Sequence, residues 1–307
     1  MNTVWVLGDA VVDLLPDGEH RYLRCPGGAP ANVAVAISRL SGKSAFIGRV
    51  GNDPLGRFLR QTLQQEGVAI DHMYLDPIHR TSTVIVDLDL HGERTFTFMV
   101  NPSADQFLEI DDLPKFEKNQ WLHFCSIALI NQPSRTTVQH AVTQIKQAGG
   151  FVSFDPNLRP SLWLNENVMI EEVNKMVAMA DVIKFSEEEI CLLSHNPDLE
   201  QAIIQTRQQY PDKLILVTLG ADGALYFYQQ ISGKIAGNKV NVVDTTGAGD
   251  AFVGGMLQGL AQHPHWQQET VLAQSIQQAN LCGGLATTAK GAMSALPTRQ
   301  QVAQLTQ

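Results

Sequence analysis

The sequence predicts an α/β fold in three layers, in which helices cover both faces of a mostly parallel β-sheet and a small second sheet is attached. Short apolar strands alternate with helical stretches beyond residue 100, which is the pattern of a parallel sheet. Two hairpins early in the chain do not fit this alternation. No linker, internal repeat or low-complexity tract interrupts the 307 residues, so we expect one domain over residues 1–307.

The first hundred residues should contain two central strands, two helices and the two hairpins. Val4–Leu7 and residues 45–50 are short apolar runs typical of buried strands. One helix should open at Pro30 and another should cover residues 54–65. The hairpins are expected at residues 11–15 with 22–24 and, around the turn His91-Gly92-Glu93, at residues 81–90 with 94–100.

The remainder of the chain should form the regular part of the main sheet. Ligands in such sheets bind at the carboxyl ends of the strands, so polar residues that follow a strand become candidates for function. Strands are expected at 121–126, 151–155, 181–185 and 214–219, a late hairpin at 226–228 with 231–236, and helices at 134–147, 168–180, 187–209 with a break near Pro197, 251–261, 269–288 and 298–307.

Composition argues against several classes of partner. The net charge is −9 and lysines and arginines do not cluster, so we expect no nucleic-acid or membrane partner. The N-terminus lacks the basic region of a signal peptide, and no apolar run is long enough to span a bilayer. The four cysteines lie far apart without a C-x-x-C pair, as expected of reduced thiols in a cytoplasmic protein.

The stretch from Asp244 to Gly255 carries the strongest local signal. A strand end leads into Thr-Thr-Gly-Ala-Gly and then into a helix of small residues. The free N–H groups at a helix start hold anions, most often phosphate. Asp250 would repel such an anion unless it takes a proton from the group that attacks the phosphate. The alternative is a plain turn in which an Asp or Thr caps the helix.

Acidic and glycine-rich positions after the first strand are candidates for binding a polyol, because carboxylates accept hydrogen bonds from hydroxyl groups. We interpret Asp9 as a turn cap, whereas Asp13 is either a ligand-binding carboxylate or an exposed hairpin residue. Gly27-Gly28 and Asn32 could contact a sugar. The same residues also suit a plain turn with Pro30 at the first helical position.

Three later strand ends carry further candidates. Arg159 is a fork-shaped donor suited to phosphate, or it forms a buried ion pair with Asp155. Residues 184–189 contain three glutamates, one of which could orient waters around Mg²⁺, although an acidic first helical turn explains them too. Residues 218–223 suit a nucleotide contact or a tight turn.

Several common motifs are absent from the sequence. There is no G-x-x-x-x-G-K-[ST], no G-x-G-x-x-G after the first strand, no H-E-x-x-H, no G-x-S-x-G and no Cys/His metal spacing. A P-loop enzyme is therefore excluded, and a dinucleotide-dependent oxidoreductase is disfavoured.

Together and in this order, these segments resemble the ribokinase-like (PfkB-type) carbohydrate kinases along nearly the whole chain. The N-terminal motif is similar at residues 27–32 and 48–56, and the C-terminal motif at 244–252. Within the family, 155–159 with Leu162-Trp163 resembles bacterial fructokinases. Residues 92–98 and 288–293 resemble both fructokinases and aminoimidazole riboside kinases.

The resemblance implies a mechanism centred on Asp250. This residue would accept the proton of the attacking hydroxyl while the N–H groups of Gly247, Ala248 and Gly249 form the anion hole. An aspartate near its ordinary pKa of about 4 is a weak base, so proton transfer should come late. The family's sugar contacts map onto Asp13, Gly28, Asn32, Phe98, Asp250 and Arg159, of which Arg159 would also face the γ-phosphate.

The resemblance also implies ATP, Mg²⁺ and K⁺ as cofactors. ATP would contact Lys184, Ser186, Glu189, Thr218, Gly220, Ala221, Gly223, Gly247 and Gly249, with Glu189 holding Mg²⁺ through water. Ser186 stands where many members have Asn, so its role differs in detail. K⁺ would be held, mainly by backbone carbonyls, at Asp244, Thr246, Ala286, Ala289 and Gly291.

In the family, the early hairpins form a lid over the sugar, here about residues 11–25 and 80–101, and pair between subunits in a homodimer. The implied reaction is transfer of the γ-phosphoryl of ATP to a hydroxyl of D-fructose, giving fructose 6-phosphate. Aminoimidazole riboside, ketodeoxygluconate and ribose are alternative substrates. A non-catalytic sensor of the same fold is a different class of function, and Asp250 argues against it.

Overall fold

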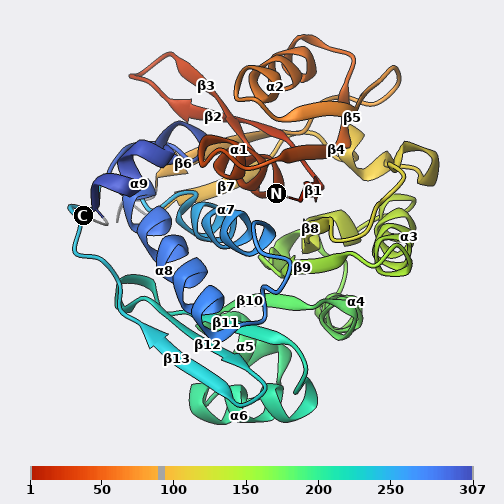
Figure 1. Ribbon diagram of the computed structural model, residues 1–307. Helices are drawn as coiled ribbons and strands as arrows, with labels where there is room; N and C mark the ends of the chain where they lie inside the picture. The colour runs from red at the N-terminus through yellow and green to blue at the C-terminus, as the bar shows by residue number, and fades with distance from the viewer. Residues whose placement is uncertain (1, 89–93, 306–307) are drawn as a thin grey trace.

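The computed structural model describes residues 2–88 and 94–305, and in this part of the chain a sheet of nine strands forms the centre (Figure 1). Every neighbouring pair is parallel except β11–β12 and β12–β13. The mostly parallel sheet predicted from the alternation is therefore confirmed. In spatial order the strands are β13 (Ile231–Ile235), β12 (Ala224–Tyr228), β11 (Leu214–Thr218), β10 (Val182–Ser186), β9 (Phe151–Asp155), β8 (Trp121–Cys125), β1 (Val4–Leu7), β4 (Ser44–Gly51) and β5 (Ala69–Asp76).

Helices cover both faces of this sheet because apolar residues of its strands point alternately to either side. On β11, Leu214 and Leu216 pack with one group of helices, and Ile215 and Val217 with the other. The first group is α1 (Ala29–Arg39), α2 (Pro54–Gln65), α7 (Ala248–Ala261), α8 (Glu269–Ala286) and α9 (Arg299–Leu305); the second is α3 (Ser134–Gln147), α4 (Glu166–Met179), α5 (Glu187–Leu193) and α6 (Leu199–Gln209).

A second sheet of four strands, in the order β3-β2-β6-β7, is built from the two early hairpins. β2 (Val11–Pro16) pairs antiparallel with β3 (Tyr22–Gly27), and β6 (Thr83–Leu88) pairs antiparallel with β7 (Arg94–Phe98). A parallel pairing of β2 with β6 joins the hairpins. Both predicted hairpins are confirmed, while the turn at His91-Gly92-Glu93 lies outside the described residues.

Strand β5 was not predicted. It lies at one edge of the main sheet, parallel to β4, and only Met73 and Asp76 are buried. Polar residues such as Asp71 and His72 interrupt its apolar pattern, so composition alone does not indicate a strand. The break predicted near Pro197 is confirmed, since α5 ends at Leu193 and α6 begins at Leu199.

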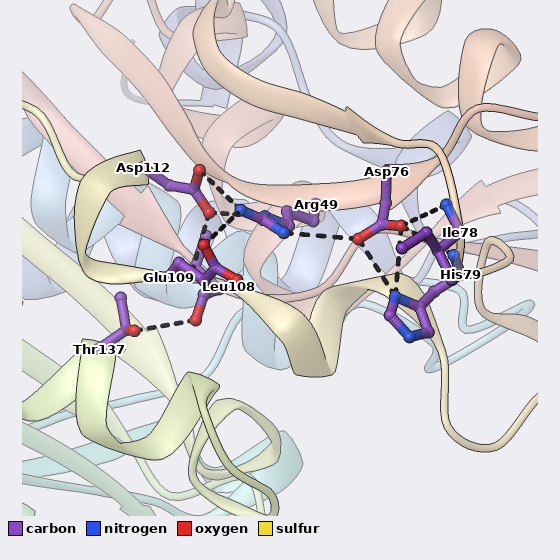
Figure 2. A network of polar contacts seen from close by, with 8 residues as sticks. All are labelled: Arg49, Asp76, Ile78, His79, Leu108, Glu109, Asp112 and Thr137. Carbon is purple, nitrogen blue, oxygen red and sulfur yellow. Dashed lines mark hydrogen bonds and ion pairs between the residues drawn. The ribbon is translucent and has the colours of Figure 1, made fainter.

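Short 3₁₀ turns connect several elements, among them η1 (Ala104–Phe107) and η2 (Ile110–Asp112). A polar network fixes η2 and the two residues that precede it (Figure 2). Arg49 of β4 donates to Asp112 through Nε over 2.6 Å and lies 3.5 Å from Asp76. The Thr137 hydroxyl donates to the Leu108 carbonyl over 2.8 Å. The remaining turns are η3 (Ser126–Leu129), η4 (Pro160–Leu162), η5 (Gly220–Asp222) and η6 (Met293–Ala295).

The helix after the anion-binding turn begins earlier than predicted. We expected it from residue 251, but α7 starts at Ala248, so Asp250 lies in its first turn.

Within the described ranges, none of the helices combines the length and the apolar character that a bilayer crossing requires.

Candidate active site

A cavity of about 860 Å³ opens where the four-stranded sheet faces the carboxyl ends of the central strands. Its walls come from both sheets and from the starts of α1 and α7. The motifs that the sequence placed far apart are therefore brought to one place. The lining residues that the sequence had singled out are Asp9, Asp13, Gly28, Asn32, Phe98, Asp155, Arg159, Lys184, Asp244, Thr246, Gly247, Gly249 and Asp250.

The turn before α7 depends on Gly247, which caps the helix in the left-handed conformation with φ 78°. A Cβ atom there would lie 2.9 Å from the Cα of Ala292, so a larger residue is excluded by space as well as by backbone angle. The start of α7 lines the cavity at Gly247 and Gly249, so the positive end of its dipole lies at the cavity wall. This geometry suits a phosphate group.

The contribution of Ala248 to the anion hole stays a prediction. Its N–H donates to the Thr245 carbonyl over 3.2 Å, and Ala248 does not line the cavity. A hydrogen bond within the turn therefore occupies this donor. Gly247 and Gly249, which do line the cavity, remain as the backbone positions that face it.

Asp250 lies at the base of the cavity, where its Oδ2 accepts a hydrogen bond from the Asn32 amide over 2.8 Å. Burial raises the pKa of Asp250 to about 6, with a smaller contribution from the charge of Asp155. The Asn32 hydrogen bond and the nearby Lys184 and Arg159 oppose this rise. The expectation of an ordinary pKa was therefore wrong, and Asp250 is a stronger base than an exposed aspartate.

The ion pair considered between Asp155 and Arg159 is not formed. Asp155 instead pairs with Lys184, whose Nζ lies 3.1 Å and 3.0 Å from its two oxygens. Although burial acts to lower it, the Asp155 carboxylate raises the pKa of Lys184, which stays protonated. Arg159 is exposed and lines the cavity, so its guanidinium group is available to a phosphate.

The candidate sugar contacts converge on the cavity from the four-stranded sheet and from the start of α1. Asp13 comes from β2 and Phe98 from β7, whereas Gly28 and Asn32 come from the start of α1. Gly28 has φ 96°, and a Cβ atom there would lie 2.7 Å from the Asp9 carbonyl. The start of α1 can therefore pack this closely against the backbone after β1 only with glycine at this position.

Among the candidate ATP contacts, Lys184, Gly247 and Gly249 line this cavity, and the others do not. Ser186 and Thr218 are register partners at the carboxyl ends of β10 and β11. Glu189 uses both carboxylate oxygens structurally, accepting from Leu158 N and Ser186 N over 2.8 Å each. Together with Ser186 it forms a capping box at the start of α5, which was not predicted from the sequence. Gly220, Ala221 and Gly223 lie in and just after η5.

The candidate K⁺ positions gather beside the α7 turn. Asp244 accepts from Thr246 N and Oγ1 over 3.0 Å and 2.7 Å, and from Gly291 N over 2.7 Å. Its carboxylate therefore joins the turn to the loop after α8, which contains Ala289 and begins next to Ala286. Among the described residues, no three His, Cys, Asp or Glu side chains are grouped to hold a metal ion. A cation here would rest on backbone carbonyls.

Some lining residues were not singled out from the sequence. Phe96 lies on the same face of β7 as Phe98, so the period-two alternation could have revealed it. Lys290 stands within the stretch that carried the family resemblance, between two candidate K⁺ positions. Asn157 and Ile127 follow strand ends but carry no signal of their own. Asp9, interpreted as a turn cap, lines the cavity instead.

Comparison with known proteins agrees with this geometry. The model of the pfkB family carbohydrate kinases matches residues 1–299. The chain belongs to this family. A fructokinase of Vibrio alginolyticus is 55% identical over 98% of both chains. This family assignment makes the chain a sugar phosphotransferase.

Solved structures of the family share the fold closely. Fructokinase from Vibrio cholerae O395 with fructose, ADP and calcium bound has a TM-score of 0.94 at 54% identity, covering 99% of this chain and 98% of that one. A double mutant of that enzyme binds fructose, ADP and potassium, with a TM-score of 0.94 at 53% identity and the same coverage. Aminoimidazole riboside kinase from Salmonella enterica, with its riboside and an ATP analogue, has a TM-score of 0.93 at 41% identity over 100% of both chains.

Proposed function

We propose that this protein is an ATP-dependent fructokinase, which transfers the γ-phosphoryl group to O6 of D-fructose. The observation that supports this most directly is the position of Asp250. Its carboxylate lies in the first turn of α7, beside a helix start suited to phosphate. It faces a cavity whose lining side chains are of the kinds that commonly bind sugars. The high identity to fructokinases supports the same substrate.

In this proposal Asp250 accepts the proton of the attacking hydroxyl. The hydrogen bond from Asn32 holds the carboxylate in place, and the raised pKa makes it a better acceptor. Gly247 and Gly249 stabilise the charge that develops on the phosphoryl oxygens. Arg159 contacts the γ-phosphate from the opposite wall. ATP supplies the phosphoryl group, and its adenosine part lies along Ser186, Thr218 and η5.

Two metal ions fit the residues present. Glu189 retains free lone pairs on both oxygens beside its hydrogen bonds, so it can orient a water bound to Mg²⁺. K⁺ suits the carbonyls of Asp244, Thr246, Ala286, Ala289 and Gly291, because the carboxyl end of α8 adds a negative dipole end there. The K⁺ would stabilise the turn that precedes α7.

We also propose that the four-stranded sheet, within about residues 11–25 and 80–101, is a lid over the sugar and the contact surface of a homodimer. Tyr22, Leu23 and Met99 are each 56% exposed, which a partner lid would cover. A monomeric mass in sedimentation at micromolar concentration would contradict the dimer.

Reduced cysteines and dependence on ATP support a cytoplasmic location.

The proposal is tested by an ADP-release assay on D-fructose, ribose, ketodeoxygluconate and aminoimidazole riboside, each with K⁺ or Na⁺ as the only monovalent cation. We expect the highest kcat/KM with fructose and greater activity in K⁺. Preference for the riboside would assign the protein to the aminoimidazole riboside kinases. No turnover of any substrate would favour a non-catalytic sensor.

A further inference from the structure

The cavity is lined by more acidic than basic side chains, although the ATP of the proposed function is itself an anion. The acidic residues that line it are Asp9, Asp13, Asp155, Asp244 and Asp250, and the basic ones are Arg159, Lys184 and Lys290. Like charges repel more strongly where little water separates them. The phosphate groups of ATP therefore need cations that are able to face them, in addition to the positive end of the α7 dipole.

Lys184 is occupied by a carboxylate and contributes little net charge to the cavity. Its Nζ lies 3.1 Å and 3.0 Å from the two oxygens of Asp155. In the part of the chain that the structure describes, neither Arg159 nor Lys290 forms an ion pair. Arg159 is the phosphate contact proposed above, whereas Lys290 has no role in that proposal.

The loop after α8, which carries Lys290, is fastened to the turn that precedes α7. Val243 N and Asp244 N both donate to the Thr287 carbonyl, over 2.7 Å and 3.1 Å. Gly291 N donates to Asp244 Oδ2 over 2.7 Å. These hydrogen bonds lie on either side of Lys290 and involve its neighbours alone. They fix the backbone at this position while the exposed lysine side chain stays free to move.

The same loop packs against the glycine at the start of α7. A Cβ atom added to Gly247 would lie 2.9 Å from the Cα of Ala292, two residues beyond Lys290. Lysine carries its charge on a flexible four-carbon stem. With the two backbones this close, that stem can bring the ammonium group to a phosphate held at the helix start.

We propose that the ammonium group of Lys290 binds the terminal phosphoryl group of ATP, which makes Lys290 a further substrate-binding residue. This inference rests on the use of ATP in the proposed function. The contact forms without breaking an ion pair, and a hydrogen bond between two charged groups is among the strong ones. The terminal group is the one concerned because the loop packs on Gly247, and the proposed base Asp250 lies in the helical turn that begins there.

The experiment is calorimetric titration with ADP and with the non-hydrolysable analogue AMP-PNP, each with Mg²⁺ and without sugar. In Lys290→Met, the affinity for AMP-PNP should fall roughly tenfold to a hundredfold, which is typical for loss of a hydrogen bond to a charged group. The affinity for ADP, which lacks the terminal phosphoryl group, should change far less. Lys290→Arg keeps the charge and should bind AMP-PNP more tightly than Lys290→Met does.

A matched control is Lys234→Met, which removes an equal charge from β13. Lys234 is exposed and does not line the cavity, so both nucleotide affinities should stay unchanged. Turnover of D-fructose gives a second measurement. In Lys290→Met the kcat/KM for ATP should fall by a factor similar to that for AMP-PNP binding, while the KM for fructose stays the same. A merely structural role of Lys290 would not separate the two substrates in this way.

An unchanged affinity of Lys290→Met for AMP-PNP would overturn the proposal. Equal losses for ADP and AMP-PNP would also overturn it, because the lysine would then serve phosphates that both nucleotides share. So would Lys290→Arg binding as weakly as Lys290→Met, since the charge would then not matter. If the unmodified protein binds neither nucleotide, both the ATP site and this inference are wrong. If it binds them but phosphorylates no sugar, the proposed substrate is wrong, while the two titrations still decide on Lys290.

Discussion

Asn32 donates a hydrogen bond of 2.8 Å to Asp250, although the two residues are 218 positions apart in the chain. One lies in α1 and the other in the first turn of α7. These helices pack side by side on the same face of the sheet (Figure 1). The contact joins the two most specific motifs of the sequence, and it orients the carboxylate of the proposed base.

Replacing Asp250 with Ala should nearly abolish phosphoryl transfer. A general base contributes about 10²–10⁴-fold to the rate, and no other carboxylate lies in the first turn of α7. ATP binding should persist, because the backbone of the turn is retained. The measurements are ADP release with fructose and calorimetric binding of ATP. Activity within a few fold of the unmodified protein would show that another group accepts the proton.

The kcat/KM for the sugar should depend on pH through Asp250. The base works only when ionised, and burial raises its pKa to about 6, so activity should fall as the pH drops through that value. Asn32→Ala removes a hydrogen bond that stabilises the charged form, so the acid limb should move to higher pH. The observable is the midpoint of the normalised profile, which is independent of any loss of sugar contacts.

A suitable control for the pH profile is Asn280→Ala. The Asn280 amide donates to the Ile235 carbonyl over 3.0 Å and makes no contact with the cavity. Its removal should leave the midpoint of the acid limb unchanged. If both variants shift the limb equally, or neither does, then the Asn32 contact does not set the pKa of Asp250.

The sequence revealed the parts of the fold whose signal is local. The alternation of strands and helices predicted the parallel sheet, and the glycine turn before α7 marked the anion site, because both depend on neighbouring residues. β5 was missed since its polar residues hide an edge strand. Asp9 was misinterpreted because burial is not visible in a sequence.

Pairings between distant side chains were the least predictable part of the site. Asp155 was considered as a partner of Arg159, four positions on, but it pairs with Lys184 from the adjacent strand. The choice depends on strand order, since β9 and β10 are neighbours in the sheet. In the same way, the anchoring of η2 by Arg49 follows from the position of β4 and cannot be deduced from spacing.

Asp53 should control how well the proposed lid closes. Its Oδ1 caps α2 by accepting from Leu55 N and Gly56 N, and both of its oxygens bind Thr81, two residues before lid strand β6. Asp53→Asn keeps the capping oxygen but places an NH₂ group against the Thr81 N–H. An unpaired buried donor costs about 1–3 kcal/mol, so the KM for fructose should rise roughly tenfold or more.

The KM for ATP should change little in Asp53→Asn, because the ATP contacts lie on β10, β11 and α7. Asp198→Asn is a matched control, since Asp198 caps α6 through Gln201 N over 2.9 Å and lies away from the lid. It should leave both KM values unchanged. Equal increases in the two KM values for Asp53→Asn would point to general loosening of the fold instead of a change in the lid.

Breaking the Lys184–Asp155 pair should destabilise the protein far more than breaking an exposed pair. Both side chains are at most 10% exposed, so Lys184→Met leaves a buried negative charge without a partner. Such a change costs about 3–5 kcal/mol of unfolding free energy.

The comparison is Lys146→Met, whose partner Asp181 is 28% exposed and can be solvated. Loss of this exposed ion pair should cost about 0–1 kcal/mol. Urea unfolding of both variants measures the difference directly. Similar losses in the two variants would mean that water reaches Asp155 and solvates its charge.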